Sequence, residues 1–449
     1  MLLFKRILST VTVLSCLAFT LQAEAAEAPQ PLFSGEVSSS AVQAMHPFPE
    51  HEQYQAGTIK PNYVSQNQLD DEVRKKYNEW KTRYLKKHPK KSDQYYVFYN
   101  LEKEAAPDNA VSCSEGHGYG MLISALMAGY DPQAKDYFDG LYRFYKAHPS
   151  VNNPALMAWQ QIKTGAGDII DTPPSNSDDG SRSATDGDMD IAYALLLADK
   201  QWGSSGPIDY LSEGKAAIAA IMKEDVNQQK WSLKFGDWVE NNDPDYGLAT
   251  RPSDFMLSHL RAFGNAAGDP NWAKVADNTY GIIQTISTKY SPTTGLLPDF
   301  VVWSNGGYAP SPPNLLETDR DGYFSWNAAR VPWRVPVDYL LSGDTRALNQ
   351  TKLTNAWISK KTNGNPSKIV AGYKLNGDPL DDNDPAIAYS APFAVSAMLD
   401  SSNQNWLNTL WKSIVNAPTS SNSYYGNSIR LLCMITISGN WWDPTDASN

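Results

Sequence analysis

One carboxylate stands alone at the head of an apolar stretch, which makes it a candidate for acid–base chemistry. Glu115 is the only Asp or Glu between Ala110 and Tyr130, and three glycines follow it before the apolar run 121–128. Burial would disfavour its charged form and raise its pKa, which suits a general acid. Alternatively, Ser112 and Glu115 form a capping box, in which the glutamate bonds only backbone N–H groups. The spacing alone favours the cap and leaves both interpretations open.

A second acidic cluster opens another apolar stretch. Asp186, Asp188 and Asp190 occupy alternate positions in the segment 184–197. This alternation is typical of calcium loops, but the positions that such a loop reserves for glycine and glutamate hold isoleucine and leucine, so we exclude that site. Capping of a helix N-terminus is the common alternative. Three aspartates are more than a cap requires, which leaves a functional role open.

A third cluster combines acids with arginines. A polar loop holds Glu317, Asp319 and Asp321 and leads into a predicted helix that carries Arg330 and Arg334. The six histidines show neither His-x-x-x-His nor His-Glu-x-x-His spacing, so no zinc site and no other metal is expected. The sequence also lacks a Gly-x-Ser-x-Gly elbow for an acyl enzyme. We therefore expect the chemistry from carboxylates, without a cofactor.

The elements that must position these clusters are helices. Strongly apolar helices alternate with amphipathic ones, and loops rich in Gly, Pro and Asn join them. This alternation predicts an all-α fold in which an inner ring of helices is wrapped by an outer ring, with the long loops at one rim. Short strands are predicted only at 95–99 and 300–303. Helices are predicted at 69–87, 115–129, 133–147, 154–163, 188–200, 207–223, 253–266, 270–288, 324–341, 345–360, 386–400, 403–415 and 424–438.

The N-terminal residues predict export from the cell. Lys5 and Arg6 precede an apolar region from 7 to 21, and small-residue cleavage sites follow at Ala25 and Ala28. The apolar region is too short for a membrane anchor, and no other run approaches membrane-spanning length. We therefore expect a secreted protein with a signal peptide over 1–25, an extended leader over 26–67 and one catalytic domain over 68–449.

Charge and composition narrow the partners. The formal net charge is −11, and a negative surface argues against nucleic-acid binding. The chain is rich in aromatic residues, which in proteins stack on flat ligands such as sugar rings. Cys113 and Cys433 remain after signal cleavage, and a disulfide or two buried free thiols are equally open. We expect a monomer that binds no membrane.

The three clusters, in this order, resemble glycoside hydrolase family 8. The motifs are Ser-Glu-Gly-x-Gly-Tyr-Gly-Met at 114–121, Ala-Thr-Asp-Gly-Asp-x-Asp-Ile-Ala-Tyr-Ala at 184–194 and Asn-Ala-x-Arg-Val-Pro at 327–332. The stretches 156–159 and 250–255 support the match, and as a set the motifs are highly specific. The resemblance implies an (α/α) barrel of six helical hairpins. It also implies endo-hydrolysis of β-1,4-linked polysaccharides with inversion at the anomeric carbon.

The resemblance further implies roles for single residues. Glu115 falls on the general acid of the family, and Asp186 falls on the aspartate that holds the distorted sugar at the cleavage point. The positions expected to bind substrate are Trp159, Trp238, Trp326, Asn327, Arg330, Tyr424 and Tyr425.

The expected base is missing from its usual position. Many members of the family have an aspartate where this chain has Asn327, and an amide cannot accept the proton. A second group of the family, which includes chitosanases, uses a glutamate from a preceding loop. We therefore assign Glu317 as the general base, with Asp319 and Asp321 as fallbacks.

The resemblance favours chitosan as the substrate, with β-glucan as a possible second one. Chitosan requires carboxylates along the cleft that pair with glucosamine ammonium groups. The candidates, around Trp238, are Asp237, Glu240, Asp243 and Asp245, and for most of them an ordinary acidic loop is the favoured interpretation. The alternative is an endo-β-1,4-glucanase or a lichenase, which cleaves β-1,3-1,4-glucan, without chitosanase activity. A more remote alternative is an inactive carbohydrate-binding protein on the same scaffold.

Overall fold

The computed structural model describes residues 43–103, 107–174, 179–380 and 386–446. The predicted signal peptide and the first part of the predicted leader lie outside these residues. All described residues belong to a unit that begins at Val42. None of the helices in this part of the chain combines the length and apolar character needed to cross a membrane.

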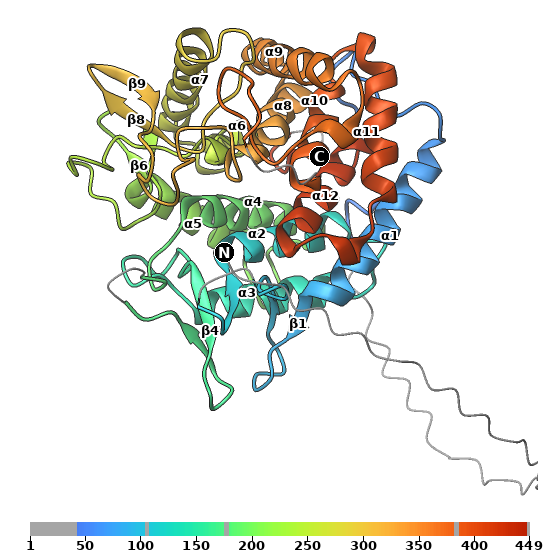
Figure 1. Ribbon diagram of the computed structural model, residues 1–449. Coiled ribbons are helices and arrows are strands. Elements are labelled where there is room, and N and C mark those ends of the chain that lie inside the picture. Colours follow the sequence, from blue (N-terminus) through green and yellow to red (C-terminus); the bar gives the residue numbers. More distant parts are fainter. Residues whose placement is uncertain (1–42, 104–106, 175–178, 381–385, 447–449) are drawn as a thin grey trace, which may run out of the picture. The chain divides into compact units, whose positions relative to one another are not determined.

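Six largely apolar helices form an inner ring (Figure 1). Each contacts the next one in the chain, and α12 contacts α2, which closes the ring. Almost every residue of α2 and α10 is buried, because neighbouring helices cover them on all sides. The inner helices are α2 (Ser114–Leu126), α4 (Thr185–Trp202), α6 (Leu257–Ala267), α8 (Val331–Ser342), α10 (Ile387–Ala397) and α12 (Tyr424–Ile437).

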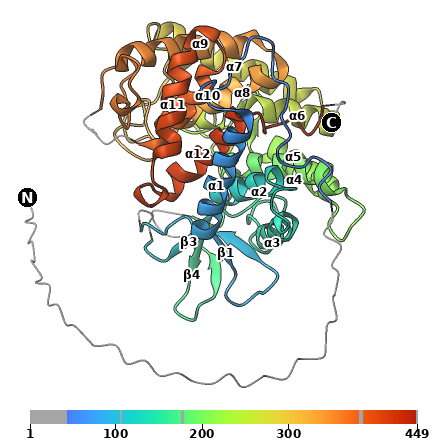
Figure 2. The ribbon, with the colours of Figure 1, turned by 90° about the vertical axis from the view of Figure 1, so that its right-hand side faces the viewer.

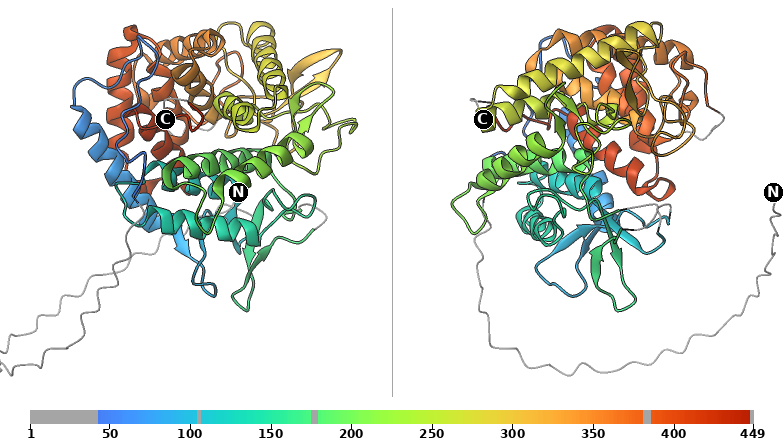
Figure 3. Two further views of the ribbon diagram at one scale, coloured as in Figure 1. Left: turned by 180° about the vertical axis from the view of Figure 1, so that it is seen from behind. Right: turned by 90° about the vertical axis from the view of Figure 1, so that its left-hand side faces the viewer.

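Six further helices surround this ring (Figure 2). Each outer helix packs against the inner helix that precedes it, and the first one, α1, packs against α12, so that the two ends of the barrel lie side by side (Figure 3). The double ring confirms the predicted (α/α) barrel of six hairpins. The outer helices are α1 (Gln66–Tyr84), α3 (Ala134–Ala147), α5 (Tyr210–Glu224), α7 (Asn271–Lys289), α9 (Thr345–Thr362) and α11 (Gln404–Asn416).

The helix predicted at 154–163 is wrong. Its second half is strand β4 (Gln160–Lys163), the centre of an antiparallel sheet with β3 (Ala110–Cys113) and β5 (Ile169–Asp171). Leu156 and Met157 are buried, but in irregular backbone. The partner β3 lies about fifty residues earlier, and a periodicity argument within one window cannot detect such non-local pairing.

The helix predicted at 324–341 starts later than expected. Phe324 pairs with Tyr373 in an isolated bridge, and a 3-10 turn, η2 (Ala328–Arg330), precedes α8. The Oδ1 atom of Asp299 accepts the backbone N–H groups of Ser325 (3.1 Å) and Ala328 (2.7 Å). This carboxylate satisfies N–H groups at the start of the 3-10 turn, where the chain has no earlier helical turn to supply acceptors.

The remaining strands form three two-stranded hairpins at the edges of the barrel. The strands predicted at 95–99 and 300–303 are present as β2 and β8, each paired with a partner that was not predicted. The hairpins are β1 (Leu85–Lys87) with β2 (Tyr95–Val97), β6 (Val226–Asn227) with β7 (Ser232–Leu233), and β8 (Val301–Ser304) with β9 (Gly307–Pro310).

Residues 43–65, which we call the strap, cross the C-terminal ends of the inner helices without regular secondary structure of their own. Helix C-termini carry carbonyl groups that have no partner within the helix. Backbone N–H groups of the strap donate to such carbonyls in or just after five inner helices. The pairs are Met45 with Gln201, Phe48 with Ala128, Glu52 with Gly439, Gln55 with Leu340, and Ile59 with Met398.

Candidate active site

The N-terminal ends of α2, α4 and α12 meet η2 and the loop 311–322 around a cavity of about 330 Å³. Most of the predicted site residues line this cavity, although they come from distant parts of the chain. These residues are Glu115, Trp159, Asp186, Glu317, Asn327, Tyr424 and Tyr425. The other lining residues are Tyr99, Cys113, Ser114, Ala184, Arg251 and Ser423.

Glu115 lies in the first turn of α2, but it does not cap that helix. The N-cap is Cys113, whose Sγ accepts a hydrogen bond from the backbone N–H of Gly116 (3.4 Å). The capping box considered for Ser112 is not formed, because Ser112 lies within strand β3, one residue before the cap. The carboxylate of Glu115 is therefore left to face the cavity.

The Glu115 carboxylate is held by two partners. Its Oε2 accepts a hydrogen bond from Nη1 of Arg330 (2.8 Å), and its Oε1 accepts one from the Tyr424 hydroxyl (3.1 Å). A Cβ at Gly116 would lie 2.6 Å from that hydroxyl, so the tyrosine reaches the acid only over a glycine. Burial raises the pKa of Glu115 to about 7, against the opposing charge of Arg330 and with the support of the Asp186 carboxylate.

The close crossing of α2 and α4 brings their first turns together. A Cβ at Gly187 would lie 2.6 Å from Cβ of Ser114, and a Cβ at Gly118 would lie 2.7 Å from Cβ of Asp190. Both distances are far below van der Waals contact, so the two helices approach this closely only because these positions lack a side chain. The glycines of both motifs thus serve to place the two acidic first turns side by side.

Asp186 is bound by two guanidinium groups. Its Oδ2 pairs with Arg330 (2.8 Å) and its Oδ1 with Arg251 (3.0 Å), and Oδ1 also accepts the N–H of Gly187 (2.9 Å). Burial alone would raise its pKa, but the two arginines outweigh this effect and hold the pKa well below its usual range. Asp186 is therefore ionised. Arg251 lies in a stretch that supported the family resemblance, but the sequence assigned it no role.

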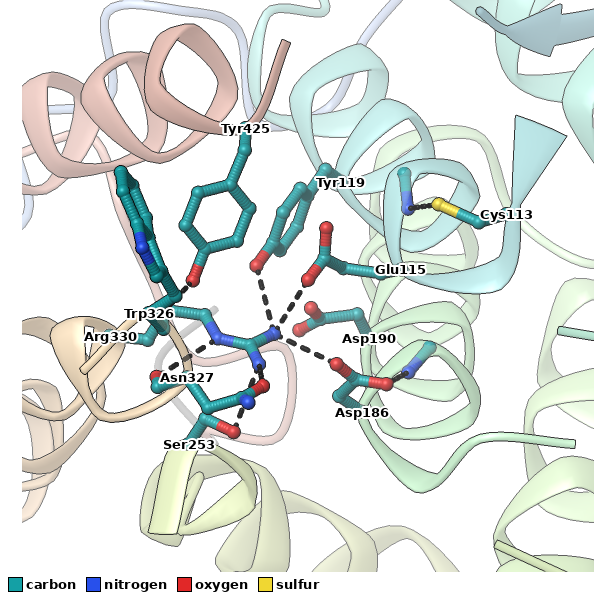
Figure 4. Close-up of polar contacts among 12 residues, drawn as sticks. Cys113, Glu115, Tyr119, Asp186, Asp190, Ser253, Trp326, Asn327, Arg330 and Tyr425 are labelled. Atoms are coloured by element: carbon teal, nitrogen blue, oxygen red, sulfur yellow. Dashed lines mark hydrogen bonds and ion pairs between the residues drawn. The ribbon is translucent and has the colours of Figure 1, made fainter. Parts of the chain in front are cut away.

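Arg330 lies between Glu115 and Asn327 and donates hydrogen bonds to both (Figure 4). It contacts Glu115 directly and Glu317 only through Asn327. Its Nη2 donates to Oδ1 of Asn327 (2.9 Å), and Nδ2 of Asn327 donates to Oε2 of Glu317 (2.8 Å). The Ser253 hydroxyl also accepts from Nη2 (3.0 Å). Two side chains thus stand between the two glutamates.

A second charged pair lies one helical turn deeper in the barrel. Arg334 donates to Oδ1 of Asp190 (3.0 Å), and Nε2 of His259 lies 3.0 Å from the same oxygen. Both ends of this pair are buried. Because Arg334 follows Arg330 by four residues and Asp190 follows Asp186 by four, α8 and α4 form two successive Arg–Asp rungs. We call the Arg330–Asp186 pair the upper rung and the Arg334–Asp190 pair the lower rung. Only the upper rung borders the cavity.

Glu317 reaches the cavity from the loop before η2. Glu317 is exposed, yet the protein atoms around its carboxyl replace enough water to raise the pKa of this group, while Arg251 and the Asn327 amide act in the opposite direction. A raised pKa makes a carboxylate a stronger proton acceptor. Glu317 therefore has the position expected of a base, and its role stays a prediction.

The two fallback bases lie elsewhere. Neither Asp319 nor Asp321 lines the cavity. Asp319 is exposed, whereas the Asp321 carboxylate is buried and accepts backbone N–H groups of its own loop. These positions leave Glu317 as the acidic side chain of the loop that faces the cavity.

Aromatic side chains flank the acids. Trp159 lines the cavity with its Nε1 bonded to the carbonyl of Asp179 (3.1 Å). Tyr425 lines it too, and its hydroxyl donates to the carbonyl of Trp326 (2.5 Å). Trp326 itself is 43% exposed beside Asn327, at the edge of the cavity. These flat surfaces suit sugar rings.

Trp238 does not line the cavity. It packs against Tyr246 (ring centroids 5.6 Å apart) and Phe235 (6.3 Å) in a small apolar cluster. The cluster also includes Leu315 of the loop 311–322, which carries Glu317 and which we call the base loop. The prediction that it binds sugar alongside the other aromatic residues therefore receives no support from its place. Its packing makes it part of the support beneath that loop.

The carboxylates proposed to recognise chitosan also lie away from the cavity. Asp237 is buried and accepts the N–H of Ser183 (2.9 Å) and the hydroxyl of Ser150. Asp243 accepts the N–H groups of Asp245 and Tyr246. Among the described residues, the carboxylates that line the cavity are Glu115, Asp186 and Glu317, and each of these already has an expected role.

The two cysteines of the described chain do not pair, although Cys113 lines the cavity. Cys113 and Cys433 are both buried free thiols, which decides between the two possibilities that the sequence left open. His117, two residues after the acid in sequence, turns to the carbonyl of Leu141 (2.7 Å), and burial lowers its pKa to about 4. Among the described residues, no group of three or more His, Cys, Asp and Glu side chains is placed to hold a metal ion.

The chain is similar to known proteins over most of its length. The chain is 51% identical over 396 residues to a beta-glucanase of Niallia circulans, covering 88% of this chain and 91% of the relative. It is 41% identical over 414 residues to an endoglucanase of Bacillus sp. (strain KSM-330), covering 92% and 84%. Both matches extend across nearly the whole barrel.

A solved structure has the same fold. The apo structure of a beta-1,3-1,4-glucanase from Paenibacillus sp. X4 superposes with a TM-score of 0.82 at 50% identity, covering 89% of this chain and all of that one. The sequence pattern that describes "Glycosyl hydrolases family 8" matches residues 67–439. This chain therefore belongs to glycosyl hydrolase family 8 and is a glycoside hydrolase.

Proposed function

We propose that this enzyme is an endo-acting, inverting β-glucanase that cleaves β-1,4 bonds in glucans, mixed-linkage β-1,3-1,4-glucan included. The observation that carries the proposal is the arrangement of Glu115 and Glu317 in one cavity, joined through Arg330 and Asn327. The names of the two relatives and of the superposed structure support the substrate class.

Glu115 is the general acid in this proposal. It must carry a proton at the working pH, and burial raises its pKa to about 7. It then protonates the glycosidic oxygen as the bond to the anomeric carbon breaks. The contacts from Arg330 and Tyr424 orient the carboxyl, and they stabilise the carboxylate that remains after the proton has left.

Glu317 is the general base. Inverting enzymes place a water between the base and the anomeric carbon, with the two carboxyl groups about 6.5–9.5 Å apart. The base removes a proton from this water as its oxygen attacks the face opposite the leaving group. The two side chains that separate Glu317 from Glu115 are consistent with room for a water.

Asp186 holds the sugar at the cleavage point. Its carboxylate is ionised, buried and fixed by two arginines, so it accepts hydrogen bonds from sugar hydroxyls without having to reorganise. A preorganised carboxylate also stabilises the positive charge that develops on the ring in an oxocarbenium-like transition state. Its contribution is therefore larger in the transition state than in the bound substrate.

A neutral glucan suits this cavity better than chitosan. In the part of the chain that the structure describes, each carboxylate that lines the cavity has an assigned role, and the candidates for pairing with glucosamine do not line it. The relatives named above are glucanases as well. We therefore prefer the endo-glucanase or lichenase alternative over the chitosanase interpretation of the sequence.

The test measures reducing ends released from β-1,3-1,4-glucan, carboxymethyl-cellulose and soluble chitosan by the same enzyme preparation. We expect rapid release from one or both glucans and little from chitosan. NMR of the first product should show the α-anomer, because inversion at a β-bond gives it. Faster cleavage of chitosan would contradict the substrate assignment, and a β-anomer formed first would contradict inversion.

We also propose that the chain is exported and works as a monomer. Support for export comes from the charged, apolar and Ala-x-Ala regions at the N-terminus. Mass spectrometry of protein from the culture medium should find an N-terminus after Ala25 or Ala28. Light scattering of the purified enzyme should give the mass of one chain, and a dimer mass would overturn that part.

A further inference from the structure

We propose that Asp321 is a positioning residue for the base: its buried carboxylate fixes the backbone of the loop that presents Glu317 to the cavity. The inference rests on the proposed role of Glu317. It gives Asp321, which the sequence offered only as a fallback base, a different function.

The carboxylate of Asp321 accepts three consecutive backbone N–H groups. Oδ2 accepts those of Leu316 (2.8 Å) and Glu317 (3.0 Å), and Oδ1 accepts that of Thr318 (2.7 Å). Hydrogen bonds to an ionised acceptor are roughly twice as strong as neutral ones. Asp321 is only 1% exposed, so water does not compete for these donors. One side chain thus holds the base residue and both of its neighbours.

Asp321 is itself fixed to the frame of the barrel. Its carbonyl accepts the N–H of Phe300, which directly precedes strand β8. The next residue, Gly322, runs so close to the Ser311 carbonyl that a Cβ there would lie 2.4 Å from the oxygen. Strand β8 therefore positions the backbone of Asp321. The carboxylate of Asp321 in turn positions residues 316–318.

A loop needs such a device more than a helix does. Glu115 inherits its position from α2, whereas Glu317 lies in a segment without helix or strand. Catalytic groups must be held within about 0.5 Å of their productive position. Asn327 fixes only the Oε2 atom of Glu317 (2.8 Å), so the backbone below that atom requires a separate anchor. Asp321 provides it.

Asp321 also contributes a negative charge near the base. The charged groups that act on Glu317 are Arg251 and Arg330, which lower its pKa, and Asp321, which raises it; Asp299 interacts with it as well. Replacing Asp321 by a neutral residue removes a negative charge that raises the pKa of Glu317. The pKa of Glu317 should then fall.

The test is Asp321→Asn, which keeps the shape of the side chain but loses the charge and one of the two acceptor atoms. A displacement of about 1 Å can cost 100-fold in rate, so kcat on β-1,3-1,4-glucan should fall about 10- to 100-fold. KM should change less than about twofold, because Asp186 and the aromatic residues are untouched. The acidic limb of the kcat–pH profile should shift to lower pH, and the basic limb, set by Glu115, should stay.

Asp209→Asn is the matched control. Asp209 caps the N-terminus of α5 by accepting the N–H of Ser212 (2.9 Å), and it does not line the cavity. We expect it to leave kcat, KM and both pH limbs unchanged. The control therefore distinguishes the general effect of losing a carboxylate cap from the specific effect of losing the Asp321 carboxylate.

Three results would overturn the inference. The first is an Asp321→Asn enzyme with wild-type kcat and an unmoved acidic limb. The second is a rate loss that appears in KM alone. The third is an Asp321→Asn chain that fails to fold while Asp209→Asn folds, because Asp321 would then hold the barrel and not the base loop. A wild-type enzyme without glucanase activity would instead refute the proposed function, so the two failures are distinguishable.

Discussion

The two ends of the inner helices contrast sharply. At their N-terminal ends, α2 and α4 carry Glu115 and Asp186 in their first turns, facing a cavity with two arginines beside them. At the C-terminal ends, the strap covers the helices and donates backbone hydrogen bonds to their carbonyls. The same helices therefore serve the cavity at one end and the closure of the barrel at the other.

Helix polarity explains this division. The N-terminus of a helix presents free N–H groups and the positive end of its dipole, which favours carboxylates by about 0.3–1 kcal/mol each. The C-terminus presents free carbonyls, which need donors. A strap without regular structure has backbone N–H groups to supply them. We therefore expect substitutions at the cavity to alter turnover and substitutions at the strap to alter stability.

The largest effect is expected for the acid. Glu115→Gln removes the proton donor but keeps the size of the side chain, so kcat should fall by about 10²–10⁴-fold. The thermal midpoint should stay or rise, because a buried carboxyl group is replaced by a neutral one. Steady-state kinetics and calorimetry measure both. Turnover within tenfold of wild type would exclude Glu115 as the acid.

The next largest effect is expected at the upper Arg–Asp rung. Arg330→Lys keeps the charge but not the fork that reaches Glu115, Asp186 and Asn327 together, so kcat should fall about 100-fold. The lower rung provides the matched variant: Arg334→Lys should reduce the thermal midpoint while kcat changes little. Equal losses of kcat in both variants would show that the rungs do not differ in function.

At the strap, Phe48→Ala should lower stability and spare turnover. Phe48 is 5% exposed, packs edge-on against Tyr130 (6.3 Å) and lies under the guanidinium of Arg74 (5.3 Å). Truncating a buried phenylalanine costs about 3–5 kcal/mol. Denaturant unfolding should report that loss, and kcat measured well below the transition should match wild type. A fall in kcat without a fall in stability would contradict the claim that the strap serves only the stability of the barrel.

The smallest effect concerns pH. The acid must be protonated, so activity should be present below about pH 7 and be lost as pH rises through the pKa of Glu115. The base must be ionised, so activity should be lost as pH falls through the pKa of Glu317, which lies above its usual value. His117→Gln should move neither limb, because that imidazole faces Leu141. A shift of the acidic limb in this variant would contradict its place.

Features that depend on neighbours in sequence were predictable from the chain alone. The apolar helices, their alternation and the acids at the heads of α2 and α4 follow from local patterns, and the motifs supplied the family. Glu317 was identifiable because the absence of an acid at Asn327 required another acceptor.

Features that depend on three-dimensional packing were not predictable. Strand β4 forms through pairing with a distant segment, and Trp238 packs under the base loop because of contacts that no spacing reveals. The sequence assigned no role to Arg251, because only the fold brings this residue to Asp186. The sequence suggested Ser112 as the cap of α2. In the structure Ser112 lies within strand β3 and the helix begins at Ser114, so Cys113 is the N-cap.

The most direct test of the central claim, that the loop residue Glu317 is the base opposite Glu115, is chemical rescue of Glu317→Ala. Without a base the variant should turn over at least about 100-fold more slowly than wild type. Azide needs no deprotonation, so it should attack the anomeric carbon from the position of the water while Glu115 protonates the leaving oxygen. We predict restored cleavage with an α-glycosyl azide as the product, identified by NMR. Wild-type turnover of the variant without azide, or a β-glycosyl azide as the product, would contradict the account.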